Sequence, residues 1–374
     1  MDRDYRPIGF FSADSPEAES CTEILEEGCE LEIPPTCLLN DHVPHWQGSE
    51  GHVLRQSTPG PTRVMYQDNA GVLLSCGSSC ILTQEGRVVN RLADASADLA
   101  CANPLLEINI KPPERELSGV SIVPVGRCCP DNYWHFTTGV HALLLLAIRH
   151  SLFSGREPVK RIIIPNFTRD VFVQMLNLCW FPGADELEVV LMNEGGHVCC
   201  EKVIAVGNAM GWEHLVPPWK QSLVRSVYLR NRSAVGVSPH KKVLIVRKNV
   251  GRGFADQDMV VKVCAAKGYI PVDLEGMTFL EQAALFNAAT HIIAAHGSGL
   301  TNLFYAQKGA RVLEIFNPFY VVDYFTTLAE LNGLTHYTLV GDGPRPNARV
   351  SSRTNDPIVF KEEAFASAIR KFEN

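Results

Sequence analysis

The feature that most constrains the fold is an alternation, from Val120 onward, of short β-branched runs with longer amphipathic segments. Runs such as residues 161–165 and 242–247 have the length of buried strands, whereas the segments between such runs have the length of helices. A helical crossover of this kind joins one parallel strand to the next. The alternation therefore predicts an α/β fold in which helices cover parallel sheets.

A polar stretch at residues 231–240, which contains Gly, Ser and Pro, divides this pattern into two α/β units. The 374 residues of the chain are more than one ordinary core needs and suit two domains. We therefore expect two Rossmann-like, doubly wound lobes with a cleft between them. The expected parts are a strand-rich and loop-rich N-terminal region at 1–117, lobes at 118–235 and 236–345, and a loop with a terminal helix at 346–374.

The second lobe shows the alternation most regularly. A stretch rich in Pro, Arg, Asn and Ser follows it at 341–356 and is expected to be a mobile loop before a helix at 362–372. The expected strands are residues 242–247, 269–273, 291–295, 311–315 and 335–340, and the expected helices are 257–267, 279–289, 300–307 and 322–332.

The composition narrows the class of protein. Hydrophobic residues make up 46% and charged residues 20% of the chain, which is typical of a soluble globular protein. The net charge of -7 gives no general attraction to nucleic acid, and no nucleic-acid-binding motif is present. The N-terminus shows no secretory signal, and the longest apolar run, 142–148, is too short for a bilayer. We therefore expect a cytoplasmic protein, which could still lie beside a membrane through a partner.

The motifs of common metal and cofactor sites are missing. Cys76 and Cys80 could clamp a metal, but no CxxC motif pairs with a second CxxC or with an HxxxH motif. Asp256-Gln257-Asp258 resembles a metal-binding DxD motif, yet Asp256 is better explained as the N-cap of an expected helix. GxSxG, HExxH and P-loop motifs do not occur. We expect no metal and no cofactor.

The strongest local signal is a glycine-containing turn between an expected strand and an expected helix. The strand ends in His296 and is followed by Gly297, Ser298 and Gly299. Glycines let a backbone approach a ligand closely, and the N–H groups and dipole at a helix N-terminus attract phosphate. His296 should face the crevice where open α/β sheets bind ligands. A tight turn also needs glycines without any ligand, so a purely structural interpretation stays open.

Two arginines and one glutamate could complete a nucleotide site around this turn. Arg247 stands at the end of the first strand of the same lobe, and Arg252 follows it, in a run without a carboxylate. Guanidinium groups pair with phosphate through two hydrogen bonds. Glu314 closes the next strand, about where Rossmann units place the acidic residue that binds ribose hydroxyls. The alternative for the arginines is a basic loop that only faces water.

In the first lobe, a polar and aromatic segment follows a strand and begins a helix. His135 could act as a general base, because histidine titrates near neutral pH, and Asp131 could orient or replace it. The alternative is structural: Asp131 or Asn132 would cap the helix, and Trp134 and Phe136 would lie in the core.

Together these segments resemble glycosyltransferase family 61. The resemblance covers roughly residues 118–340 and rests on blocks that occur in the right order. The family usually has Ala where Ser298 stands, and an Asn-Glu pair where Asp256-Gln257 stands. The blocks are Asn132-Tyr-Trp-His135, then the strand that ends in Arg247 with Arg252 after it, and finally His296-Gly-Ser-Gly-Leu-Thr-Asn302-Leu-Phe followed by Val-Leu-Glu314.

The resemblance implies a GT-B architecture, inverting chemistry and a UDP-sugar donor, commonly without a catalytic metal. Because the sequence shows no membrane anchor, it looks like a microbial, cytoplasmic member, for example one that assembles capsule or surface polysaccharide. The residues expected to bind the donor are Arg247, Arg252, His296, Gly297, Ser298, Gly299, Asn302 and Glu314.

The expected reaction is a single displacement by a hydroxyl of a glycan or another acceptor. His135 or Asp131 would take the proton of this hydroxyl, which would attack the anomeric carbon of the nucleotide-sugar. The arginines and the N–H groups after His296 would stabilise the departing diphosphate.

Two other functions fit parts of the same sequence. A nicotinamide-dependent oxidoreductase would share the Gly-Ser-Gly turn and Glu314, although Asn302 replaces the third glycine of the dinucleotide fingerprint. A non-catalytic scaffold of polysaccharide assembly would bind a nucleotide-sugar without transferring its sugar.

Overall fold

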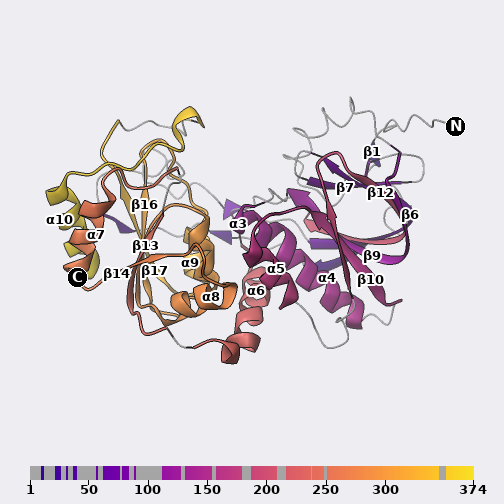
Figure 1. The fold of residues 1–374 in the computed structure, drawn as a ribbon, viewed down its shortest axis with the longest axis horizontal. Helices are drawn as coiled ribbons and strands as arrows, with labels where there is room; N and C mark the ends of the chain where they lie inside the picture. Colours follow the sequence, from indigo (N-terminus) through magenta and orange to yellow (C-terminus); the bar gives the residue numbers. More distant parts are fainter. Residues whose placement is uncertain are drawn as a thin grey trace. The chain divides into compact units, whose positions relative to one another are not determined.

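The structure is a computed structural model of the chain. The described residues fall into two compact units: unit 1 comprises those within 1–30, 58–213 and 222–224, and unit 2 those within 31–57, 214–221 and 225–374 (Figure 1). The structure describes residues 10–11, 22–26, 31–32, 37–39, 56–57, 62–75, 78–83, 88–89, 112–127, 131–153, 157–178, 187–208, 216–236, 238–247, 251–344 and 351–374.

Unit 1 is built on a mixed sheet with the strand order β1-β8-β7-β6-β12-β9-β10-β11, in which β2 also pairs with β6. β9 runs parallel to β12 and β10, and β10 runs parallel to β11. β6 pairs antiparallel with β12, β7 and β2. The strands are β1 (Phe10–Phe11), β2 (Thr22–Glu26), β6 (Thr62–Ser75), β7 (Ser78–Leu82), β8 (Val88–Val89), β9 (Arg115–Arg127), β10 (Val159–Pro165), β11 (Glu188–Met192) and β12 (His197–Asn208).

The prediction of an α/β fold is confirmed, but the sheet of unit 1 is only partly parallel. β6 and β7 come from the N-terminal region at 1–117, which the sequence pattern separates from the first lobe. β6 pairs with β12 from Leu73 opposite His197 to Thr62 opposite Asn208. These partners lie far apart in the chain, so local periodicity gives no sign that they meet.

The expected helix near residues 133–150 is continuous but changes type. α3 (Tyr133–His135) leads into the π-helix η1 (Phe136–His141) and then into α4 (Ala142–Phe153). The leucines at 143–146 are all buried, as expected for a helix that is apolar all round. α5 (Asp170–Asn177) also belongs to unit 1, and α6 (Pro218–Asn231) has residues in both units.

Unit 2 is built on a parallel sheet with the strand order β14-β13-β15-β16-β17-β4. The first strand of its α/β pattern, β13, therefore lies between the second and the third. The strands are β4 (Cys37–Leu38), β13 (Lys242–Val246), β14 (Ile270–Asp273), β15 (His291–Ala295), β16 (Arg311–Phe316) and β17 (Thr335–Val340); β3 (Leu31–Glu32) and β5 (Gln56–Ser57) form a separate pair.

The helices of unit 2 lie where the pattern predicts them, with different ends. In β13 and β15 only the first residue is partly exposed and the next four are buried, which is typical of strands covered on both faces. Asp256 caps α7, because its carboxylate accepts from the N–H of Met259 at 2.9 Å. The helices are α7 (Gln257–Ala265), α8 (Phe279–Ala288), the 3-10 helix η3 (Ser298–Tyr305), α9 (Thr326–Leu331) and α10 (Glu362–Glu373), with short 3-10 turns η2 (Arg232–Ala234) and η4 (Ser351–Arg353).

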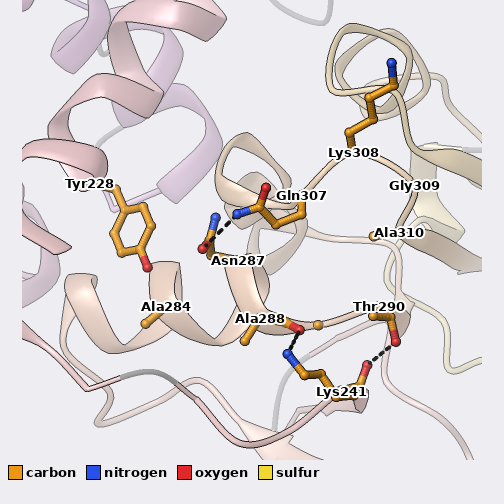
Figure 2. A pocket seen from close by; sticks show the side chains of 11 residues that line it. Tyr228, Lys241, Ala284, Asn287, Ala288, Thr290, Gln307, Lys308, Gly309 and Ala310 are labelled. Atoms are coloured by element: carbon orange, nitrogen blue, oxygen red, sulfur yellow. Dashed lines mark hydrogen bonds between the residues drawn. The ribbon is translucent and has the colours of Figure 1, made fainter.

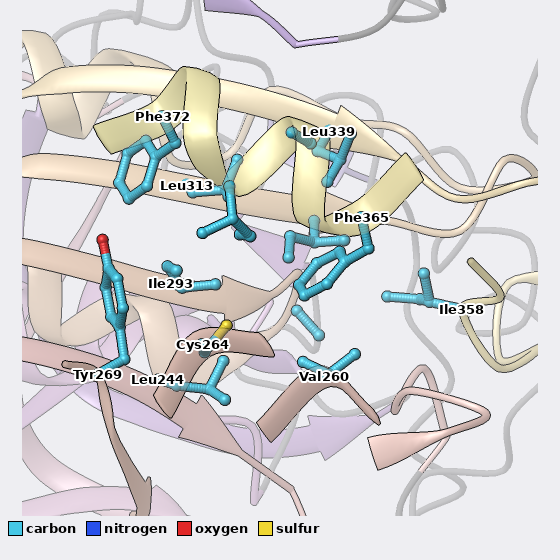
Figure 3. Close-up of a cluster of buried hydrophobic side chains, with 14 of the residues drawn as sticks. Leu244, Val260, Cys264, Tyr269, Ile293, Leu313, Leu339, Ile358, Phe365 and Phe372 are labelled. Carbon is cyan, nitrogen blue, oxygen red and sulfur yellow. The ribbon is translucent and has the colours of Figure 1, made fainter. Parts of the chain in front are cut away.

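The C-terminal helix α10 closes the core of unit 2. Phe365 and Phe372 of α10 join one apolar cluster with Leu244, Ile293 and Leu313 from three neighbouring strands (Figure 3). The carboxylate of Glu373, at the end of α10, accepts hydrogen bonds from Tyr269 and Lys242. This packing holds the strands in position relative to one another, and with them the residues at the strand ends. No helix in the described part of the chain has both the length and the apolar character needed to cross a membrane.

We predict that Phe365→Ala lowers the free energy of unfolding by about 3–5 kcal/mol, because the side chain is fully buried and its removal leaves a cavity. Val359→Ala is the matched control: that side chain is 48% exposed, and its removal should change the free energy by less than about 0.5 kcal/mol. Urea denaturation measures both values. Equal effects of the two substitutions would contradict the assigned core.

Candidate functional site

The candidate site lies where β13 and β15 end side by side. The two strands are parallel, with Ile245 opposite Ala294, so Arg247 and His296 follow neighbouring strand ends. Chain order changes direction here, because β14 lies on one side of β13 and β15 on the other. Open α/β sheets bind ligands in the crevice at such a switch point, beyond the carboxyl ends of the strands.

Arg247 packs directly on the glycine turn. Its Nη1 donates to the carbonyl of His296 at 3.5 Å. A Cβ atom at Gly297 would lie 2.7 Å from both terminal nitrogens of the guanidinium. The backbone of Gly297 is extended, with φ 163°, so close approach and not backbone strain requires glycine at this position. The structure thus brings together Arg247 and the predicted turn.

The turn continues into η3 (Ser298–Tyr305). Ser298 and Gly299 are partly exposed, whereas Leu300 to Tyr305 are buried. The N–H groups of the first turn of a helix have no partner within the helix, so this end can donate to an anion. The turn therefore presents a partly exposed serine beside helix N–H groups, next to Arg247.

Arg252 lies near His296, because the side chains of both residues contact the same aromatic ring. Its guanidinium lies over the ring of Tyr320 at 5.2 Å, and the same ring lies 5.2 Å from the His296 imidazole. The backbone of Arg252 has φ 63°, in the left-handed region that side chains other than glycine rarely adopt. Its Nε is buried and has no hydrogen-bond acceptor among the residues that the structure describes.

A buried carboxylate holds two histidines behind the turn. Nδ1 of His296 lies 2.5 Å from one oxygen of Glu314, and Nε2 of His336 lies 2.9 Å from the other. The Glu314 side chain is 1% exposed. Aromatic rings enclose His296, with Phe316 stacked on it at 5.0 Å.

This environment sets the charge of both groups. Burial lowers the pKa of His296, and the nearby Arg252 and Arg247 lower it further, which together outweigh the hydrogen bond to Glu314. Burial alone would raise the pKa of Glu314, but the hydrogen bonds from both histidines bring it below its ordinary value. We therefore assign an ionised Glu314 and a neutral His296 that donates from Nδ1, which leaves a lone pair on Nε2.

Glu314 was expected to bind ribose hydroxyls, and its geometry gives it another role. Both oxygens are engaged by histidines, and the side chain offers almost no surface to a ligand. We therefore assign to Glu314 the role of orienting the His296 side chain. His336 could not be predicted from the sequence, where it stands as a histidine within the otherwise β-forming run of β17.

Asn302 is also brought to the turn, but as an internal brace. It is fully buried, and its amide donates to Gln282 at 3.0 Å and to the carbonyl of Gly299 at 3.1 Å. Gln282 in turn donates to the carbonyls of Leu274 and Met277 at 3.2 and 3.1 Å. These bonds hold the loop after β14 beside the turn. Gln282 was not among the site residues predicted from the sequence.

His135 and Asp131 lie in unit 1 at the start of α3. Asn132 caps this helix by accepting from the N–H groups of Trp134 and His135 at 3.0 and 3.3 Å. The Asp131 carboxylate accepts from the N–H of Thr168 at 2.6 Å. Trp134 is buried, so the structural interpretation holds for Asn132 and Trp134. His135 is half-buried and precedes the π-helix η1, an element that often occurs at functional sites.

A pocket of about 440 Å³ lies at the opposite edge of the sheet of unit 2, where the strands begin (Figure 2). Lys241 and Thr290 come just before β13 and β15. Some of the polar groups shown there bond within the protein: Gln307 donates to Asn287, and Lys241 to a backbone carbonyl, each at 3.1 Å. We place the candidate site at the carboxyl edge. Nowhere in the described ranges do three or more His, Cys, Asp or Glu side chains form a group suited to a metal ion.

Comparison with known proteins supports a glycosyltransferase, because residues 133–313 match a family model of that class. The model is the one described as Glycosyltransferase 61, which confirms the resemblance inferred from the sequence. No curated protein matches the sequence. A solved structure of the dodecameric iron-containing heptosyltransferase TibC in complex with ADP-D-beta-D-heptose is 12% identical and covers 92% of this chain and 98% of its own, with a TM-score of 0.31. At that score the likeness is too low to argue from.

We predict that Gly297→Ala weakens the binding of inorganic pyrophosphate by about tenfold or more, because the added methyl group displaces the Arg247 guanidinium. Gly236→Ala is the control, since a Cβ at Gly236 meets no atom within 4 Å. Isothermal titration calorimetry gives both dissociation constants. Unchanged affinity in the Gly297→Ala protein would show that the Arg247 contact is unrelated to anion binding.

We further predict that acidification destabilises the fold through His296. The pKa of His296 in the folded chain lies below its ordinary value of 6.5, so the unfolded chain binds a proton that the folded chain does not. The free energy of unfolding is therefore unaffected by His296 above pH 6.5, and it declines as the pH falls below this value. The depressed pKa of Glu314 acts in the same direction below its ordinary value of 4.5.

Urea denaturation at several pH values from 7 to 5 tests this prediction. The free energy of unfolding should decline less steeply with falling pH in His296→Gln than in the unaltered protein, because the substituted side chain takes up no proton. Asn231→Gln, which changes no titratable group, should keep the original decline. Identical slopes in the unaltered and His296→Gln proteins would contradict the prediction.

Proposed function

We propose that this protein is an inverting glycosyltransferase of GT-B type that moves a sugar from a nucleotide-sugar, UDP-sugar by family resemblance, to a hydroxyl of a glycan or another acceptor. One observation carries the proposal. Arg247, Arg252 and the His296-to-Gly299 turn converge at the switch point of a parallel sheet, in a segment that matches glycosyltransferase 61. In this proposal lobe 236–345 binds the donor and lobe 118–235 serves the acceptor.

The chemistry needs cations where the leaving group gains charge. As the bond between the anomeric carbon and the diphosphate oxygen breaks, negative charge builds on that oxygen. Guanidinium groups stay charged at all physiological pH values and can bind phosphate through two hydrogen bonds. The buried Nε of Arg252, which lacks an acceptor in the described structure, is a donor that a phosphate oxygen would satisfy. In this proposal the arginines take the place of a metal ion.

The turn adds neutral donors to these cations. Ser298 supplies a hydroxyl, and the first N–H groups of η3 supply donors without a partner in that helix. Glu314 holds His296 behind the turn and is itself shielded from the ligand by burial. A diphosphate would therefore meet the arginines and the turn, and not the carboxylate.

We propose His135 as the base that takes the proton from the acceptor oxygen. That oxygen then forms a bond to the anomeric carbon on the face opposite the departing diphosphate, which inverts the configuration. Asp131 is the alternative base, although its carboxylate already accepts from the N–H of Thr168. The half-buried position of His135 at a change of helix type supports this role.

A thermal-shift panel of UDP, GDP, CMP, UDP-sugars and NADH tests the proposed donor. UDP or a UDP-sugar should raise the melting temperature more than the other ligands, since a ligand that binds the folded state stabilises it by mass action. Slow hydrolysis of a UDP-sugar on long incubation would separate an enzyme from a scaffold. Stabilisation by NADH alone would contradict the proposal and favour the oxidoreductase.

Arg252→Ala should lower sugar transfer or donor hydrolysis by about 10²-fold or more, because one phosphate-binding cation is lost at the transition state. The melting temperature without ligand should change little. Arg370→Ala, which removes an exposed guanidinium from α10, is the charge-matched control. Unchanged turnover of the Arg252→Ala protein would remove this arginine from the mechanism.

His135→Gln should lower the turnover number by about 10²-fold or more while UDP affinity stays the same, because a base acts on the acceptor and not on the nucleotide. Asp131→Asn keeps one oxygen that can accept from Thr168 and should lower turnover less. Steady-state kinetics with calorimetric UDP binding distinguish the two residues. A larger loss for Asp131→Asn would reverse their roles.

A further inference from the structure

The segment at 352–358, here called the C-terminal strap, lies against the loop that carries Arg252. The N–H of Arg252 donates to the carbonyl of Asn355 at 3.1 Å. The N–H of Ala255 donates to the carbonyl of Ile358, and the N–H of Ile358 to the carbonyl of Gly253, each at 2.8 Å. The stretch expected to be a mobile loop thus includes, in its described residues, a segment bonded to the candidate site.

The strap meets the loop at its strained residue. Arg252 has a left-handed backbone, a conformation that persists only where surrounding contacts hold it. The bond from its N–H to Asn355 is one such contact. The residue before Arg252 is also packed tightly against the strap, because a Cβ atom at Gly251 would lie 3.0 Å from the Cβ of Asn355.

Asn317, directly after β16, ties the strap to the loop that carries Tyr320. Its side chain is buried, and its amide donates to the carbonyls of Thr354 and Asp356 at 3.0 and 3.2 Å. Its oxygen accepts from the N–H of Phe319 at 2.9 Å. One side chain therefore joins the strap, which holds the backbone of Arg252, to the loop whose Tyr320 ring supports the guanidinium.

A second arginine strengthens this junction. The guanidinium of Arg353, on the strap, lies 3.6 Å from the centroid of the Phe319 ring and pairs with Asp356 at 2.7 Å. Arg252 and Arg353 thus rest on adjacent rings of the same loop. The strap is held on this loop by stacking as well as by Asn317.

We propose that Asn317 is a positioning residue for the anion site: through the C-terminal strap it holds Arg252 so that the guanidinium faces a bound diphosphate. The proposal rests on the proposed function for the nature of the ligand. It adds a structural element that none of the predicted site residues belongs to. Loss of Asn317 removes two of the hydrogen bonds that hold the strap, so the loop of Arg252 is held less firmly in its strained conformation.

A double-mutant cycle with inorganic pyrophosphate as the probe tests this role in the full chain. Asn317→Ala should weaken pyrophosphate binding by about tenfold, and Arg252→Ala by at least as much. The double variant should bind no more weakly than Arg252→Ala alone, because Asn317 acts through Arg252. Asn231→Ala, which removes an amide that also donates to a backbone carbonyl, should leave the affinity unchanged.

Hydrogen exchange gives a readout that needs no ligand and no high stability. The amides of Arg252 and Ala255 should exchange faster in Asn317→Ala than in the unaltered protein, since both donate to the strap. If the single variant folds too poorly for calorimetry, Gly251→Ala, which pushes on Asn355, should give the same increase in exchange.

The outcomes separate this proposal from the proposed function. Pyrophosphate affinity that depends on Asn317 through Arg252, with no binding of any nucleotide-sugar, would support the positioning role and reject the glycosyltransferase. Additive losses, or unchanged exchange at Arg252 and Ala255, would overturn the positioning role even if UDP-sugars bind. Failure of the unaltered protein to bind pyrophosphate would overturn both.

Discussion

The pairing of β13 with β15 is the constraint on which the candidate site depends. Parallel pairing places the residues after both strands at one edge of the sheet, and the position of β14 on the far side of β13 makes this edge a switch point, where open α/β sheets bind ligands. Arg247 can approach the backbone after β15 only because Gly297 has no side chain. The core beneath, closed by α10, keeps these strand ends in register, so the distance between cation and turn is set by the fold and not by flexible loops.

The positive charge of the two arginines near the turn is partly offset by Glu314, a buried carboxylate with almost no surface for a ligand. The guanidinium groups of Arg247 and Arg252 lie near His296. The buried carboxylate of Glu314 is hydrogen-bonded to the imidazole of the same histidine. An ionised carboxylate in an apolar core persists when hydrogen bonds satisfy it, and His296 and His336 do so here. Burial and the two arginines keep His296 neutral, although the hydrogen bond to Glu314 acts in the opposite direction.

Sequence reasoning could predict the parts of this site that depend on local pattern. The strands of unit 2, the turn after His296 and the arginines after β13 follow from periodicity, glycine chemistry and charge along short segments. The roles of Glu314 and Asn302 did not follow, because burial and bonding to His336 and Gln282 arise only when separate elements pack. The antiparallel pairing of β6 with β12 and the docking of the strap were missed for the same reason. His135 and Asp131 stay predictions about chemistry.

The most direct test of the account is a crystal structure of the protein soaked with UDP. We predict density for the diphosphate at the carboxyl edge of the sheet of unit 2, within hydrogen-bond distance of Arg247, Arg252 and the N–H groups after Gly297. Density for the nucleotide in the pocket beside Lys241 and Thr290, at the opposite edge, with none at the turn, would contradict it.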